Sequence, residues 1–151
     1  MTEAKLQHHR WSGDSGQALI ETAVTVSLYA LLLLGVSEFG RLAFAAIEVA
    51  NAASAGARYA ATTGEAADST GIANAAANDA GNLTGLTTTS SYSCICSDGS
   101  SSTCGNGDCS TSHIVETVTV NTQVSFDPLF HLPGLPKTFT LKGQAVEKCL
   151  Q

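Results

Sequence analysis

The chain has little charge, few prolines and no cluster of basic residues. Only 13% of its 151 residues are charged, and 13 acidic against 7 basic residues give a formal net charge of −6. This acidic balance excludes broad binding to the phosphates of nucleic acids. The chain also has no phosphate-binding loop, nucleophile elbow or metal-hydrolase helix. We therefore expect a protein that is not an enzyme and needs no cofactor.

Large apolar side chains are scarce in the C-terminal part of the chain. Between Thr62 and Gln151, only 19 of 90 residues are Val, Ile, Leu, Met, Phe, Trp or Tyr. That is too few for a self-sufficient hydrophobic core. This part therefore needs cross-links or a partner surface in order to fold.

One long helical pattern, without proline, covers residues 17–61. Residues 17–37 carry a single charge, Glu21, and match the length of about 20 residues that crosses a bilayer. Beyond them, polar side chains recur every three, four or seven residues, which predicts an exposed amphipathic helix over residues 38–61. Its many alanines make this helix slender, so that neighbouring helices can approach it closely.

The apolar run fits a buried core helix, a cleaved secretory signal or a retained membrane anchor. The rest of the chain offers little to bury a core helix. The signal-peptidase pattern Ala43-Phe44-Ala45 lies beyond the apolar run, with two charged residues between. We favour an anchor in the lipid bilayer, with basic residues of the N-terminal segment 1–16 in the cytoplasm.

Residues 84–112 form a Ser/Thr-rich segment, which we expect to be an exposed loop. Ser and Thr make up 15 of its 29 residues, so it needs cross-links to hold a structure. The spacing Cys94-x-Cys96 is too tight for the usual zinc knuckle, so disulfides are favoured over zinc and no metal site is expected. The pairing stays open, and Cys149 is either a spare thiol or a clamp on the terminal strand. The disulfide candidates are Cys94, Cys96, Cys104, Cys109 and Cys149.

Two strands are predicted after this loop, within residues 113–126 and 137–148. Apolar and polar side chains alternate in both, and a Pro-Gly turn separates them. Residues 87–95 offer a third strand. The predicted fold is therefore α+β: a long N-terminal transmembrane and assembly helix, followed by a small disulfide-stapled head at residues 62–151 with an antiparallel β pair or small sheet.

Several motifs in the helical part resemble those of known pilus proteins. Gly16 followed by Glu21, ahead of an apolar helix, resembles the leader-cleavage site of type IV pilins and pseudopilins. Two further segments resemble the TadE-like family of tight-adherence (Flp) pilus proteins. They are Glu38-Phe39-Gly40-Arg41 and the stretch NAASAGARYAA from residue 51, whose most specific residues are Asn51, Gly56 and Arg58.

This resemblance implies a minor pseudopilin that crosses the bacterial inner membrane once, with its head outside the cytoplasm. A prepilin peptidase would cut between Gly16 and Gln17. The mature chain would then contact other pilins, pseudopilins and the pilus assembly platform. The new amine of Gln17 in one subunit would pair with Glu21 of a neighbour and set the register between packed helices.

Two alternatives stay open at this point. One is a membrane-anchored, disulfide-rich binding module that is never cleaved. The other is a soluble secreted protein that starts near Ala46.

Amino-terminal sequencing of the mature chain separates the three possibilities. We expect the sequence to begin at Gln17, because Gly16 and Glu21 frame a leader-cleavage site. A start at Ala46 would indicate secretion, and a start at Met1 in functional material would contradict cleavage.

Overall fold

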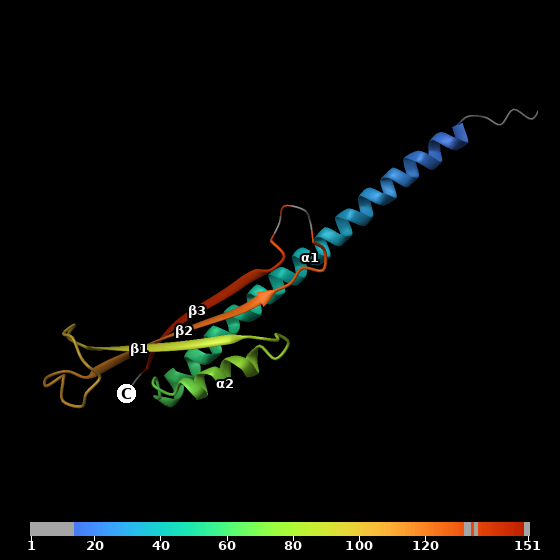
Figure 1. The fold of residues 1–151 in the computed structure, drawn as a ribbon. Helices are drawn as coiled ribbons and strands as arrows, with labels where there is room; N and C mark the ends of the chain where they lie inside the picture. Colours follow the sequence, from blue (N-terminus) through green and yellow to red (C-terminus); the bar gives the residue numbers. More distant parts are fainter. Residues whose placement is uncertain (1–13, 132–133, 135, 150–151) are drawn as a thin grey trace, which may run out of the picture. The chain divides into compact units, whose positions relative to one another are not determined.

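The computed structural model describes residues 14–131, 134 and 136–149 of the chain (Figure 1). The elements follow in the order α1 (Asp14–Thr63), α2 (Ser69–Asp79), β1 (Thr87–Cys96), β2 (Ile114–Phe126) and β3 (Phe139–Cys149). The three strands form one antiparallel sheet in the order β1-β2-β3. The predicted α+β class and the long N-terminal helix are confirmed.

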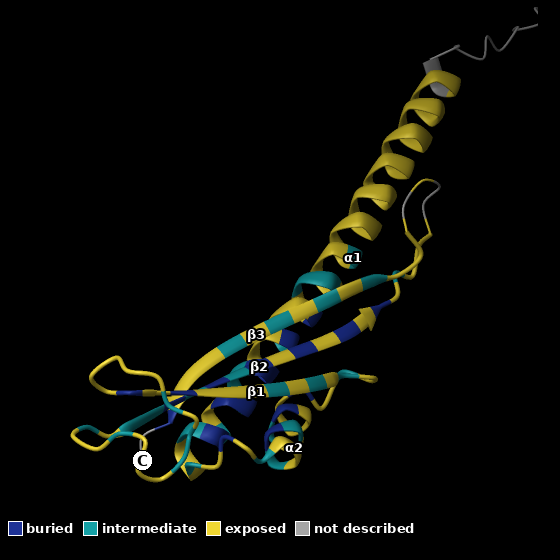
Figure 2. Ribbon diagram, turned by 60° about the vertical axis from the view of Figure 1, so that its left-hand side comes forward, coloured by how far each residue is buried: buried dark blue, intermediate teal, exposed yellow. Residues whose placement is uncertain are grey.

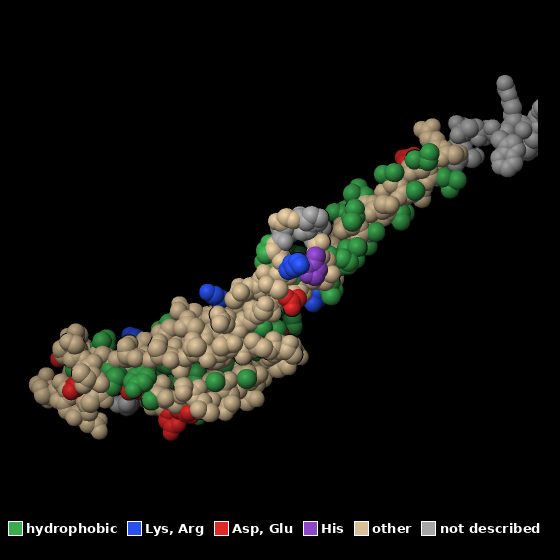
Figure 3. All heavy atoms as spheres, viewed as in Figure 1, with side chains coloured by type: hydrophobic (Ala, Val, Ile, Leu, Met, Phe, Trp, Pro, Cys, Tyr) green, Lys and Arg blue, Asp and Glu red, His purple; other side chains and the backbone are tan. Residues whose placement is uncertain are grey.

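The chain divides into two compact units between Ser37 and Glu38. In the first unit, every residue from Gly16 to Ser37 is helical and exposed, and apolar side chains cover this part of α1 in Figure 3. Asp14 to Gly16 are already helical, so α1 begins within the predicted leader. Most of the predicted leader, residues 1–13, lies outside the described residues.

The second unit begins at Glu38, so residues 38–63 of α1 belong to the head. This differs from the sequence-based division, in which the head starts at residue 62 and residues 38–61 are an exposed helix. The reason is one face of small residues, spaced by one, three or four positions, which is buried in the head (Figure 2). That face consists of Ala45, Val49, Ala52, Ala53, Gly56, Ala57 and Ala60.

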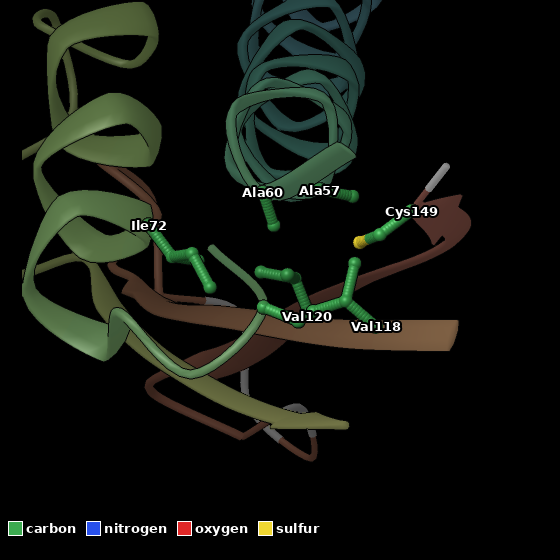
Figure 4. Packing of buried hydrophobic residues seen from close by; sticks show 7 residues of the cluster. Ala57, Ala60, Ile72, Val118, Val120 and Cys149 are labelled. Atoms are coloured by element: carbon green, nitrogen blue, oxygen red, sulfur yellow. The ribbon is translucent and has the colours of Figure 1, made fainter. Parts of the chain in front are cut away.

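The core lies between α1, α2 and the inner face of the sheet. Every second residue of β2 from Glu116 to Phe126 is buried, as the alternating sequence pattern predicts. Figure 4 shows how side chains from four elements converge there: Ala57 and Ala60 of α1, Ile72 of α2, Val118 and Val120 of β2, and Cys149 of β3. The chain thus compensates for its lack of large apolar residues by bringing thin elements close together.

Two glycines allow this close packing. A Cβ atom at Gly56 would lie 3.1 Å from the carbonyl oxygen of Ile72 and 3.3 Å from Cγ1 of Val120. A Cβ atom at Gly143 in β3 would lie 2.8 Å from Oγ1 of Thr122 and 2.9 Å from Cα of Ala50. At this crossing, the Thr122 hydroxyl donates a hydrogen bond of 2.7 Å to the carbonyl oxygen of Val49, which joins β2 directly to the backbone of α1.

Asp68 starts α2 and connects it to α1. Its Oδ1 accepts a hydrogen bond of 2.9 Å from the Gly71 amide, and its Oδ2 accepts one of 3.0 Å from the Tyr59 hydroxyl. These two hydrogen bonds, the one from Gly71 first, hold the pKa of Asp68 below its usual value. The hydrogen bond to Asp68 is also the largest cause of the raised pKa of Tyr59.

Replacing Gly56 by leucine tests the close packing. We expect Gly56→Leu to destabilise the head by about 1–3 kcal/mol, because the new side chain must displace Ile72 and Val120. Thermal unfolding of the full chain in detergent, followed by circular dichroism, measures the change.

The matched control is Gly40→Leu, on the same helix. A Cβ atom at Gly40 meets nothing within 4 Å, so this variant should unfold at or above the wild-type temperature. Equal loss of stability in both variants would contradict the packing argument.

Candidate functional site

Glu38 and Arg41 form a polar cluster at the start of the second unit. The Nη1 atom of Arg41 lies 3.2 Å from each carboxylate oxygen of Glu38, one helical turn away. The backbone amide of Leu129 donates a hydrogen bond of 2.9 Å to Oε1 of Glu38. The Arg41 guanidinium also lies 5.4 Å from the ring centroid of Phe126. The cluster therefore attaches the connection between β2 and β3 to α1.

The two middle residues of the Glu38–Arg41 motif face outward. Phe39 is 71% exposed, and the space around Gly40 is open among the described residues. The motif thus combines two residues that hold the head together with an exposed aromatic side chain. That side chain can contact lipid or another protein.

The second motif, residues 51–61, divides in the same way. Ala52, Ala53, Gly56, Ala57 and Ala60 are buried against the chain's own sheet and α2, with Gly56 at the closest approach. Asn51 and Arg58 lie on the other side, where they line a groove of about 200 Å³ together with Ala55 and Asp79. The small-residue face of this segment therefore packs within the molecule, while Asn51 and Arg58 remain exposed.

The predicted cleavage residues lie in the first unit. Gly16, Gln17 and Glu21 are all in α1, and all are exposed. Next to Glu21, the Thr22 hydroxyl donates to the carbonyl oxygen of Ala18 at 2.8 Å, so this polar residue is satisfied within the helix. Cleavage and the pairing of Glu21 stay predictions.

Two disulfides staple the Ser/Thr-rich segment to β1. They join Cys94 to Cys104 and Cys96 to Cys109. Both bridges use an inward-facing residue near the end of β1, so the excursion between β1 and β2 is cross-linked at its base. Four of the five candidates are therefore paired, and the predicted loop is corrected: residues 87–96 form strand β1, because their alternate side chains fit the register of β2.

Cys149 is a buried free thiol and does not clamp β3 to the loop. It lies opposite Glu116 in the sheet. Burial, followed by the negative charges of Glu116 and Glu147, raises the pKa of the Cys149 thiol. The raised pKa favours the neutral thiol, and the buried Cys149 packs as a small apolar core side chain.

Two aspartates organise the cross-linked segment. Oδ2 of Asp108 accepts hydrogen bonds from the amide and the hydroxyl of Thr103, at 2.6 and 2.8 Å, and from the hydroxyl of Ser102 at 3.1 Å. Oδ1 of Asp98 accepts from the hydroxyl and amide of Ser100, at 2.7 and 2.9 Å. These hydrogen bonds lower the pKa of both aspartates. Their carboxylates serve as acceptors for the turns of this segment.

Sequence reasoning missed several residues that organise the head. Leu129 contributes through its backbone amide, and Thr122 through a contact 73 positions away in the sequence. Glu48 and Asn82, whose side chains are joined by a hydrogen bond of 2.9 Å, were also missed. Sequence reasoning also missed the close approach of α1 to β3 at Gly143. The one available signal was a glycine within the alternating apolar pattern of β3, which often marks a close approach of another backbone.

Comparison with known proteins supports the interpretation of the helix. Residues 16–58 match the family model described as TadE-like protein. No curated protein and no solved structure gives a significant match. The resemblance to the TadE-like family is therefore confirmed over this part of α1, which includes the Glu38–Arg41 motif and the second motif as far as Arg58. This segment is thus similar to the TadE-like family of tight-adherence (Tad) pilus proteins.

The same helix accounts for membrane attachment. It contains a stretch long and apolar enough to cross a bilayer, and none of the residues in that stretch is buried within the molecule. The family match and this apolar helix together indicate a membrane-anchored protein.

Replacing Glu38 by alanine tests the polar cluster. We expect Glu38→Ala to raise the hydrogen-exchange rate of the Leu129 amide about tenfold, because that amide loses a charged acceptor. Hydrogen–deuterium exchange with mass spectrometry, on peptides spanning residues 127–131, measures the effect. Glu65→Ala removes an exposed carboxylate elsewhere and is the control. Unchanged exchange in the Glu38 variant would show that the contact does not hold the connection.

Proposed function

We propose that the protein is a minor pseudopilin-like component in the biogenesis of a tight-adherence (Flp-type) pilus. Residues 17–37 anchor it in the inner membrane, with the N-terminus in the cytoplasm and the head outside. It is a structural component and the substrate of a prepilin peptidase, not an enzyme. The TadE-like match over residues 16–58 is the observation that carries this proposal.

The exposed apolar surface of the first unit supports this role. Large side chains such as Leu19, Leu33 and Val36 are each about 70% exposed. In water this surface would carry a large hydrophobic penalty, whereas in lipid, or among packed helices, it carries none. The two disulfides of the head fit an oxidising compartment on the far side of the membrane.

Cleavage after Gly16 gives Glu21 a function. A carboxylate near the hydrocarbon is unfavourable by up to about 3 kcal/mol at mid-bilayer. The amine created at Gln17 of a neighbouring subunit provides a positive partner at the same depth. Such a pair would favour assembly and would fix how far one helix is shifted along the next.

The secretion alternative conflicts with the packing of the head. A cut after Ala45 would remove Glu38 and Arg41, which hold the Leu129 amide and contact Phe126. It would also create a charged terminus at the edge of the buried face of α1. The head is therefore better explained if residues 38–63 stay attached.

Changing Glu21 to alanine tests the proposed role of the carboxylate. We expect Glu21→Ala to be inserted in the membrane at the wild-type level but to reduce surface pili at least tenfold, because the subunit amine loses its partner. Electron microscopy and the yield of sheared pili measure assembly, and membrane fractionation measures insertion.

Thr22→Ala is the matched control, because it removes a neighbouring polar group that bonds only within its own helix. This variant should assemble normally. Normal pili in the Glu21 variant would refute the intersubunit pairing.

A further inference from the structure

The connection between β2 and β3 exposes two large apolar side chains that are neighbours in the sequence, Leu129 and Phe130. Leu129 is 65% exposed, and Phe130 is 49% exposed. Large apolar residues are scarce after Thr62, yet these two lie on the surface. Single exposed apolar side chains are common on proteins, whereas clustered ones mark an interaction surface.

Hydrogen bonding and stacking hold this connection against the start of the second unit. The backbone amide of Leu129 donates a hydrogen bond of 2.9 Å to Oε1 of Glu38. Arg41, which is paired with Glu38, also lies over the ring of Phe126 at the end of β2. Leu129 is therefore held next to Glu38.

The place of Glu38 in the sequence indicates the surroundings of this contact. Glu38 directly follows residues 17–37, the apolar stretch that fits the hydrocarbon core of a bilayer. A charge is unfavourable in the hydrocarbon, so the charged residues that end such a stretch lie at the level of the lipid headgroups. Leu129, bonded to Glu38, then lies at nearly the same depth.

Lipid is the partner that this depth favours. Leu and Phe side chains are typical of segments that lie in the interface between headgroups and acyl chains. Phe39, the residue after Glu38, is 71% exposed and suits the same layer. The Leu129 amide already has an acceptor, which removes the penalty for bringing this polar group close to hydrocarbon.

We propose that the β2–β3 connection is a second, interfacial membrane contact. Leu129 and Phe130 insert at the level of the headgroups of the bilayer that holds residues 17–37, and the Glu38 carboxylate keeps the Leu129 amide satisfied there. Insertion requires an apolar layer and no particular headgroup. The inference rests on the membrane anchoring that belongs to the proposed function, but not on cleavage or pilus assembly.

A single tryptophan in the connection tests the proposal, in the full chain reconstituted in phosphatidylcholine nanodiscs. Trp11→Phe first removes the one natural tryptophan of the chain. Phe130→Trp then reports the surroundings of residue 130 through its fluorescence. We expect lipids with brominated acyl chains to quench this fluorescence at least about twofold, and acrylamide in the water to quench it weakly.

Tyr92→Trp is the matched control, because Tyr92 is 47% exposed and Phe130 is 49% exposed. Tyr92 lies beside Val118, near the start of β2, whereas the connection follows the end of β2. Acrylamide should quench this control, and brominated lipid should not. A Phe130→Trp chain that behaves like the control would overturn the proposal. A blue-shifted emission without quenching by bromine would also overturn it, because it would indicate a protein partner.

Leu28→Trp, within residues 17–37, distinguishes failure of the inference from failure of the proposed function. We expect brominated lipid to quench it strongly, because the anchor lies in the hydrocarbon. If Leu28→Trp is quenched and Phe130→Trp is not, only the interfacial contact is wrong. If neither is quenched, the membrane anchor and the proposed function are wrong as well.

A charge placed in the connection gives a second measurement. Leu129→Asp, added to the Phe130→Trp chain, should reduce the quenching by brominated lipid at least about twofold, because a carboxylate opposes insertion. The control is Val146→Asp, which changes a 56% exposed apolar residue of β3 and should leave the quenching unchanged. Equal quenching with and without Leu129→Asp would contradict insertion.

Discussion

The head depends on the close approach of α1 to the inner face of its sheet. Small residues line the contacting side of the helix, and Gly143 removes the side chain at the point where β3 crosses it. The Thr122 hydroxyl then reaches the carbonyl oxygen of Val49 at 2.7 Å. With so few large apolar residues available, dense packing between thin elements replaces the usual bulky core. The second half of α1 is therefore part of the head's core.

This arrangement explains why the family motifs mix two kinds of residue. Glu38, Arg41 and Gly56 serve the head itself, because they hold the β2–β3 connection or permit close packing. Phe39, Asn51 and Arg58 are exposed and leave the motif with an outward surface. Residues 38–63 of α1 complete the core of the head. Any interaction of the outward residues thus takes place on a surface that the core keeps in place.

Sequence patterns within single segments were sufficient to predict much of this fold. The apolar length of residues 17–37 and the helical spacing of polar residues in 38–61 predicted the long helix. The period of 2 in residues 114–126 predicted the central strand. The third strand was only an option, because its Ser and Thr residues are as typical of loops as of strands. The contact between Leu129 and Glu38 could not be predicted, since it joins a helix and a connection that are 91 positions apart in the sequence.

The sequence alone determined the apolar helix, its family motifs, the alternation of β2 and the need for cross-links, because each is local or compositional. The tertiary structure decided which cysteines pair, that Cys149 stays free and that α1 from Glu38 onward packs on the sheet. These outcomes depend on distances between segments that are remote in the chain. Only the folded register of β1, β2 and β3 sets those distances, and no spacing along the sequence contains them.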